Sequence, residues 1–176
     1  MSTELVAALR PLDLIRETSA GADPNVVLSD FVGDLRGVKL PKYKLANNGL
    51  YGYTTLAVLP ANLTYGTGLT IKFYLTNHQG SDVGLKVYIG VTVKKLAANE
   101  TTDIDTGAGT EQLVSVTLSS TDGGVAIGSL AIANANLDSA GAGDAVALRI
   151  RRKGTDGTND TAQGAAILLG VDIRNT

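Results

Sequence analysis

Residues 143–175 read GDAVALRIRRKGTDGTNDTAQGAAILLGVDIRN, and this stretch decides the fold of the chain. Apolar side chains occupy every second position of residues 146–150 and again of residues 167–173. Residues 153–164 between them are rich in glycine, aspartate and threonine, which is typical of turns. Because successive side chains of a strand point to opposite faces, the pattern predicts two strands joined by a loop. A last strand needs a partner, so the preceding residues are expected to supply a sheet.

The chain from residue 50 onward repeats this pattern of short alternating strands separated by turns. Residues 69–76 and 85–94 alternate most clearly, and further strands are predicted at residues 50–59, 114–118 and 125–132. We find neither an amphipathic helix in this region nor a repeat of fixed period, which disfavours a propeller or a β-helix. The sequence therefore predicts an all-β fold, an antiparallel jelly-roll-like β-sandwich of about eight strands.

The apolar parity of these strands defines a predicted core. Between residues 125 and 132 the parity changes at Gly128, which predicts a bulge or a strand end at that glycine. Lys72, Lys86 and Arg149 lie on the other parity and are expected outside the core, because a shift of one residue would turn every side chain to the opposite face. The predicted core residues are Leu69, Ile71, Phe73, Leu85, Val87, Ile89, Val91, Val114, Val116, Val146, Leu148, Ile150, Ile167, Leu169, Val171 and Ile173.

Residues 1–48 show no sustained period. We predict that they form an irregular N-terminal arm or lead-in segment, and that residues 49–176 form the jelly-roll β-sandwich domain. Thr3–Arg10 is compatible with a short helix that ends at Pro11. The segment is too apolar for a disordered tail. Two alternatives remain open for it: a lead-in that packs beneath its own domain, or an arm that docks on a neighbouring subunit.

Composition excludes several classes of function. A chain of 176 residues suits one domain with its own core. It contains no cysteine, which excludes disulfides and thiolate metal sites, and its net charge of −2 argues against nucleic acid as a partner. No apolar run is long enough for a membrane helix, and the first residues lack the pattern of a secretory signal, so we expect no membrane partner.

The sequence predicts no catalytic residues, no cofactor and no metal, and we expect that the protein is not an enzyme. His78 is the one histidine of the chain, and it lies in a predicted turn without a partner motif. A glycine-rich loop brings Asp156, Asn159 and Asp160 together, and such oxygen atoms are ligands that calcium uses. We prefer a turn in which these side chains bond their own backbone, because the glutamate that closes a calcium loop is missing.

Two weaker signals also fail to predict chemistry. Glu100, Asp103 and Asp105 form an acidic loop, but any protein with acidic loops offers the pair of carboxylates that a glycosidase needs. Gly107–Gly109 and Gly141–Gly143 lack the lysine and the hydroxyl residue that follow the glycines of a phosphate-binding loop.

Two groups of side chains are predicted on the outer faces of the sandwich. The first is a cationic cluster of Arg149, Arg151, Arg152 and Lys153. We interpret it as a solvated sheet face, and the alternative is that it pairs with carboxylates of a neighbouring subunit. The second is Tyr74 and Tyr88, which we predict to pair across adjacent strands. A carbohydrate platform or a subunit interface is the alternative for these tyrosines.

The closing hairpin resembles that of small jelly-roll proteins of tailed bacteriophages. The resemblance rests on Leu148–Arg152, on the loop that closes at Asn159–Thr161 and on the last strand Ile167–Ile173. It extends over residues 69–173 and does not include the first 48 residues. Those phage proteins decorate capsids as cement trimers or form the trimeric tips of head and tail fibres.

The resemblance implies a structural protein of a phage particle, assembled in the host cytoplasm. We first expect a capsid decoration (cement) protein, a homotrimer that binds the major capsid protein on the outer capsid surface and stabilises it. The alternative is a trimeric fibre-tip or carbohydrate-binding module that recognises a host-surface glycan. Leu168, Tyr74, Tyr88 and the apolar residues of 1–48 have no predicted place in the core, and apolar surface left over on a domain usually marks a contact.

Overall fold

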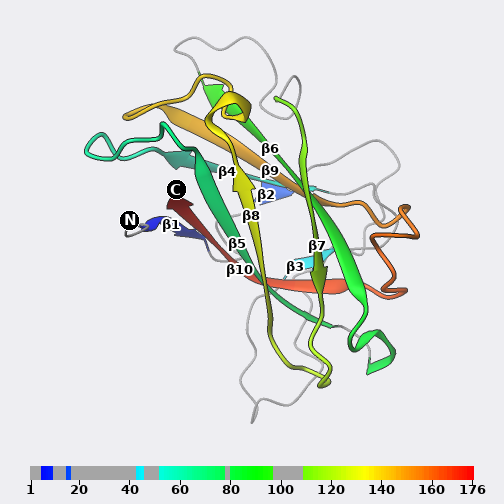
Figure 1. Ribbon diagram of the computed structural model, residues 1–176. Coiled ribbons are helices and arrows are strands. Elements are labelled where there is room, and N and C mark those ends of the chain that lie inside the picture. Colours follow the sequence, from blue (N-terminus) through cyan, green and yellow to red (C-terminus); the bar gives the residue numbers. More distant parts are fainter. Residues whose placement is uncertain (1–4, 10–14, 17–42, 46–51, 78–79, 97–108) are drawn as a thin grey trace.

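The structure is a computed structural model that describes residues 5–9, 15–16, 43–45, 52–77, 80–96 and 109–176 (Figure 1). Of residues 5–9, 15–16, 43–44 and 52–55 it describes the backbone alone. The described residues form ten strands and two short 3-10 turns: β1 (Leu5–Leu9), β2 (Ile15–Arg16), β3 (Tyr43–Leu45), β4 (Gly52–Val58), β5 (Leu69–Asn77), η2 (Gly80–Asp82), β6 (Lys86–Leu96), β7 (Gln112–Thr117), β8 (Ala126–Ile132), η3 (Asn134–Asn136), β9 (Ala145–Arg152) and β10 (Ala166–Asn175).

The strands form two five-stranded antiparallel sheets. Sheet A has the order β1-β10-β5-β8, with β3 also paired to β10, and sheet B has the order β2-β4-β9-β6-β7. The predicted antiparallel β-sandwich is thus confirmed. The pairs β3–β10, β4–β9, β5–β8 and β6–β7 are nested one inside the next, which is the order in which a jelly roll pairs its strands.

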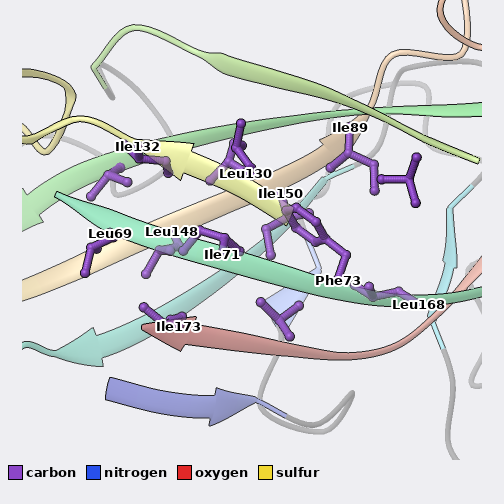
Figure 2. Packing of buried hydrophobic residues seen from close by; sticks show 14 of the residues in the cluster. Leu69, Ile71, Phe73, Ile89, Leu130, Ile132, Leu148, Ile150, Leu168 and Ile173 are labelled. Carbon is purple, nitrogen blue, oxygen red and sulfur yellow. The ribbon is translucent and has the colours of Figure 1, made fainter. Parts of the chain in front are cut away.

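The core lies between the two sheets. Figure 2 shows side chains of β5 in sheet A, such as Ile71 and Phe73, packed against side chains of β9 in sheet B, such as Leu148 and Ile150. Of the sixteen residues predicted inside, all are buried except Leu85, Val114 and Leu169. Leu85 and Val114 are half-buried and pack against the core, so the predicted parity is correct for both of their strands. On the opposite parity Lys86 is exposed, and Lys72 and Arg149 are half-buried, as the register required.

In the last strand Ile167, Val171 and Ile173 are buried as predicted, but the prediction that Leu169 is inside is wrong. The pairing of β10 with β5 passes from Leu168↔Leu75 to Gly170↔Tyr74, so Leu169 is the extra residue of a β-bulge. The bulge turns Leu168 into the core, where it is fully buried, and leaves Leu169 half-exposed. Leu168, which had no predicted place, is therefore a core residue.

The predicted irregularity at Gly128 is also wrong. β8 pairs with β5 without a register shift, and its burial alternates along the whole strand. Gly128 points inward, where a Cβ would lie 2.2 Å from a methyl group of Val116 on β7, so glycine is required by close packing. The prediction failed because it took Val125 and Ile127 to set the parity at the start of the strand, whereas both are exposed.

The predicted helix at Thr3–Arg10 is wrong as well, because Leu5–Leu9 forms strand β1 at the edge of sheet A. The antiparallel pairing of β1 with β10 outweighs the local preference of these residues. The described strands of the N-terminal segment all join sheets of their own chain, since β2 pairs with β4 and β3 with β10. For these strands the structure shows a lead-in built into the sandwich, and they raise the number of strands from about eight to ten.

Candidate functional site

The predicted cationic face is divided by the structure into one buried and three outer residues. Arg152 has the same parity as Val146, Leu148 and Ile150, and its side chain is 0% exposed. The prediction that Arg152 belongs to a solvated face is therefore wrong. The alternation of the strand already placed Arg152 on the inward parity. It was not followed in the sequence prediction, because arginine is almost never fully buried without a partner.

The buried guanidinium of Arg152 uses all five of its N–H groups. Nε and Nη2 donate to the two carboxylate oxygens of Asp160, at 2.7 and 2.6 Å, which is the bidentate geometry of a strong ion pair. The other three bonds reach backbone carbonyls: Leu45 at 3.2 Å and Gly164 at 2.6 Å from Nη1, and Ala162 at 2.5 Å from Nη2. Arg152 thereby joins β9, β3 and the loop between β9 and β10.

A second buried carboxylate holds the same loop from the other side. Asp82 at the end of η2 is 0% exposed and accepts the backbone N–H groups of Gln163 and Gly164, each at 3.0 Å. Asp160 also accepts the backbone N–H of Tyr88 on β6 at 3.0 Å. No motif marked Asp82 in the sequence, since it is a single aspartate in a turn. These charged side chains fix the loop of residues 153–164 in one conformation.

The aspartates of this loop are used by the protein itself. Asp156 accepts the backbone N–H groups of Thr158 and Asn159 at 3.1 and 3.0 Å, and these bonds, that of Asn159 first, lower the pKa of Asp156. The preferred interpretation, a turn closed by its own side chains, is confirmed for Asp156. Asp160 is occupied by Arg152. Among the described residues no group of three or more histidine, aspartate or glutamate side chains is arranged to hold a metal ion.

Two of the outer basic residues, Arg151 at the end of β9 and Lys153 just after it, form ion pairs with Glu111. Arg151 Nε donates to one oxygen of Glu111, and Lys153 Nζ lies 3.0 Å from the other. The Glu111 side chain crosses Gly90, where a Cβ would lie 2.3 Å from its Oε1. Burial raises the pKa of Glu111, but the hydrogen bonds from Arg151 and Lys153 outweigh it and hold that pKa below its ordinary value of 4.5.

This lowered pKa predicts a pH dependence of stability. A carboxyl whose pKa is lower in the folded state stabilises the fold above its ordinary pKa, and this contribution is lost as the pH falls through the folded value. We expect Glu111→Gln to lower the free energy of unfolding by up to about 1 kcal/mol near neutral pH. At about pH 3 the difference between the two proteins should be smaller, because the wild-type carboxyl takes up a proton as the pH falls below its ordinary pKa. Urea titrations at both pH values measure this, and an equal difference at both would contradict it.

The predicted cross-strand pair of Tyr74 and Tyr88 does not exist. Tyr74 lies on β5 of sheet A and Tyr88 on β6 of sheet B, so the two residues are on different sheets. The prediction took successive strands to be neighbours, whereas β5 and β6 pass from one sheet to the other. The Tyr74 hydroxyl donates to Asp172 at 2.9 Å, which raises the pKa of Tyr74, and Arg174 lies 3.1 Å from the same carboxylate.

Several residues considered in the sequence lie outside the described part of the chain. These are His78, Glu100, Asp103, Asp105, Gly107 and Ala108. Gly141–Gly143 belongs to a turn in which Asp144 accepts the N–H of Gly141 at 2.8 Å. Lys95 lies 2.8 Å from the Asp144 carboxylate, and its hydrogen bond, followed by that of Gly141, lowers the pKa of Asp144. This turn leads into β9, and its bonds are structural.

Two apolar surfaces remain on the outside of the sandwich. On β4 in sheet B, Leu56 and Val58 are 51% and 66% exposed, and we call them the β4 patch. On the far side, Val125 and Ile127 at β8 are 55% and 64% exposed, and Leu113 on β7 is 41% exposed. Within the described residues, no helix is long and apolar enough to pass through a bilayer.

Comparison with known proteins adds little to this. No protein-family model matches the chain, and no curated protein matches it. Among solved structures the chain is similar to the CBM22-1–GH10 modules of endo-1,4-beta-D-xylanase 10B from Clostridium thermocellum, solved with xylohexaose. The TM-score is 0.30 and the identity 12%, over 77% of this chain and 24% of that chain. A similarity at this level carries no argument about what this protein binds.

Proposed function

We propose that this protein is a structural protein of a bacteriophage particle, a capsid decoration protein that binds the outer capsid surface as a homotrimer. The observation that supports the proposal is the pair of apolar surfaces on opposite sides of the sandwich, the β4 patch on one side and the side formed by β7 and β8 on the other. A cement protein needs two kinds of contact, one with its own copies and one with the capsid. Exposed apolar surface on a compact domain typically marks such contacts.

The polar side chains support the same conclusion from another direction. Arg152, Asp160 and Asp82 are fully buried, and the bonds described above fix a loop of their own chain. Glu111 likewise pairs within the chain. These four charged groups thus stabilise the fold, which suits a protein that acts through its shape and surfaces. The phage context itself comes from the resemblance of the closing hairpin.

We assign the β4 patch to the capsid. β4 pairs with β2, and β1 forms the corresponding edge of sheet A, so this is the side of the sandwich on which strands of the N-terminal segment lie. The expectation that the N-terminal segment anchors the protein is retained in this form, as a proposal about one side of the molecule. The β7–β8 side lies at the other end of both sheets and stays available for contacts between copies.

The proposal is tested with empty capsids of the phage whose genes neighbour the gene of this protein. Wild-type protein should sediment with the capsids and raise the temperature at which they disrupt. Val58→Glu should weaken this binding by at least about tenfold, because a carboxylate would have to be desolvated in the contact. Thr155→Glu is the matched control and should bind as wild type does, because Thr155 is exposed beyond Arg152, at the opposite end of β9 from Ala145, which pairs with Val58. Wild-type protein that does not bind the capsids would refute the proposed function.

A second candidate is a glycan-binding module. It is favoured by Tyr74, whose half-buried ring lies on the outer face of sheet A with its hydroxyl bonded to Asp172 beside Arg174. An aromatic ring with a carboxylate and a guanidinium at its edge is a combination that binds sugar rings by stacking and hydrogen bonds. A glycan array distinguishes the candidates: binding that is lost in Tyr74→Ala would support the module, and no binding by wild type would exclude it for the glycans on the array.

A further inference from the structure

One side of the sandwich carries no charge at all along its two edge strands. Sheet A ends at β8 and sheet B ends at β7, and Figure 1 shows these two strands running beside each other. Neither Gln112–Thr117 nor Ala126–Ile132 contains a charged residue or a proline. Their outward side chains, which we call the β7–β8 stripe, are Leu113, Ser115, Thr117, Ile127, Ser129 and Ala131, and all are exposed.

Such a side is unusual for a β-sandwich that stays alone. Because β7 and β8 lie beside each other, this side offers another chain its outward side chains rather than an open strand edge, and exposed edge strands of monomeric proteins normally carry charges there. In this protein the next strands inward carry charges, Lys72 on β5 and Lys86 on β6. The uncharged stripe thus has a polar rim, which is the arrangement of a protein–protein contact.

We propose that the β7–β8 stripe is the surface through which copies of this chain contact one another, with Ile127 at the centre of the contact. This inference rests on the proposed homotrimer and names its interface. A second copy is the occupant that the charges favour: a stripe without charge meets its own copy without like-charge repulsion and without desolvating an ion. A partner recognised by charge complementarity would gain nothing here, because the stripe offers no charge to complement.

The neighbouring residues explain why Ile127 rather than Leu113 is central. Ile127 is directly opposite Tyr74 in the pairing of β8 with β5, and it is the most exposed large apolar side chain of the stripe, at 64% against 41% for Leu113. Val125, 55% exposed, lies on the same face of the chain just before β8. Gly128 faces inward against Val116, so Ile127 and Ser129 on either side of it face outward.

The test uses the purified full chain and measures mass in solution by light scattering at micromolar concentrations. The mass of the wild-type protein should be a multiple of the chain mass of 18.1 kDa, and three times the chain mass for the proposed trimer. Ile127→Lys should shift the protein to the monomer, because several lysines would be brought together at one contact. Leu56→Lys is the matched control: Leu56 is also exposed, at 51%, but lies on β4, so this variant should keep the wild-type mass.

The outcomes separate this inference from the proposed function. Ile127→Lys that keeps the wild-type mass would overturn the interface while leaving the decoration protein intact. A monomeric wild type would overturn both this interface and the proposed homotrimer, whereas capsid binding by that monomer would still support the role in capsid decoration. Identical circular dichroism spectra and melting temperatures check that the variants fold. Ser129→Lys, on the same exposed stripe, should also give the monomer, and a wild-type mass for both variants would be decisive against the proposal.

Discussion

Replacing Arg152 by alanine is expected to lower the free energy of unfolding by about 3–5 kcal/mol. The side chain and its partner Asp160 are both 0% exposed, so the substitution leaves a buried carboxylate without its counter-ion. It also removes the donors to the buried carbonyls of Leu45 and Ala162 and to the half-buried carbonyl of Gly164. Thermal denaturation should show a melting temperature lowered by roughly 6–20 °C.

Arg151 is the matched control for this experiment. It is the preceding residue of the same strand and also pairs with a carboxylate, but its side chain is 31% exposed and Glu111 keeps Lys153 as a second partner. Arg151→Ala should therefore cost about 1 kcal/mol or less. Equal losses of stability for the two variants would show that Arg152 is no more buried than Arg151. An Arg152→Ala variant as stable as wild type would contradict the hydrogen bonds by which Arg152 holds the loop of residues 153–164.

Replacing Leu168 by alanine is expected to lower the free energy of unfolding by about 2–5 kcal/mol. Leu168 is 0% exposed and belongs to the core cluster, facing Leu75 in the pairing of β10 with β5, so the truncation leaves a cavity between the sheets. Figure 2 shows its side chain among those of Phe73 and the other core residues. Urea denaturation should show a lower midpoint.

The next residue provides the control and tests the bulge. Leu169 is half-exposed and lies outside the core cluster, so Leu169→Ala should cost about 1 kcal/mol or less. The alternation in the sequence predicts the opposite order, with Leu169 inside and Leu168 outside. A larger loss for Leu169→Ala than for Leu168→Ala would therefore show that β10 runs without the bulge.

The candidate surfaces were less predictable from the sequence than the core. The exposure of Ile127 was not predicted, because a β-branched residue in an alternating strand is normally placed inside. Its orientation depends on how β8 pairs with β5, and on Gly128, whose hydrogen atom leaves room for Val116 of the other sheet. The pairing partners of Tyr74 and Tyr88 were likewise undetermined, since β5 and β6 follow each other in the chain but lie on different sheets.

The sequence by itself determined the class of the fold and most of its interior. Alternation with a period of two is a local property of strands, and it identified Leu69, Ile71 and Phe73 on β5 and Val146, Leu148 and Ile150 on β9 as core residues. The turn at Asp156 was also predictable, because its hydrogen bonds reach residues only two and three positions further along the chain.

Only the tertiary structure decided the features that depend on distant partners. Arg152 is buried because Asp160 and three carbonyls surround it, and one of these carbonyls, that of Leu45, is separated from it by 107 positions in the chain. The bulge at Leu169 is set by the register of β10 against β5, and the uncharged β7–β8 stripe exists because the two sheets end on the same side. Local preferences carry no information about such contacts, since their free energy arises only when remote segments are brought together.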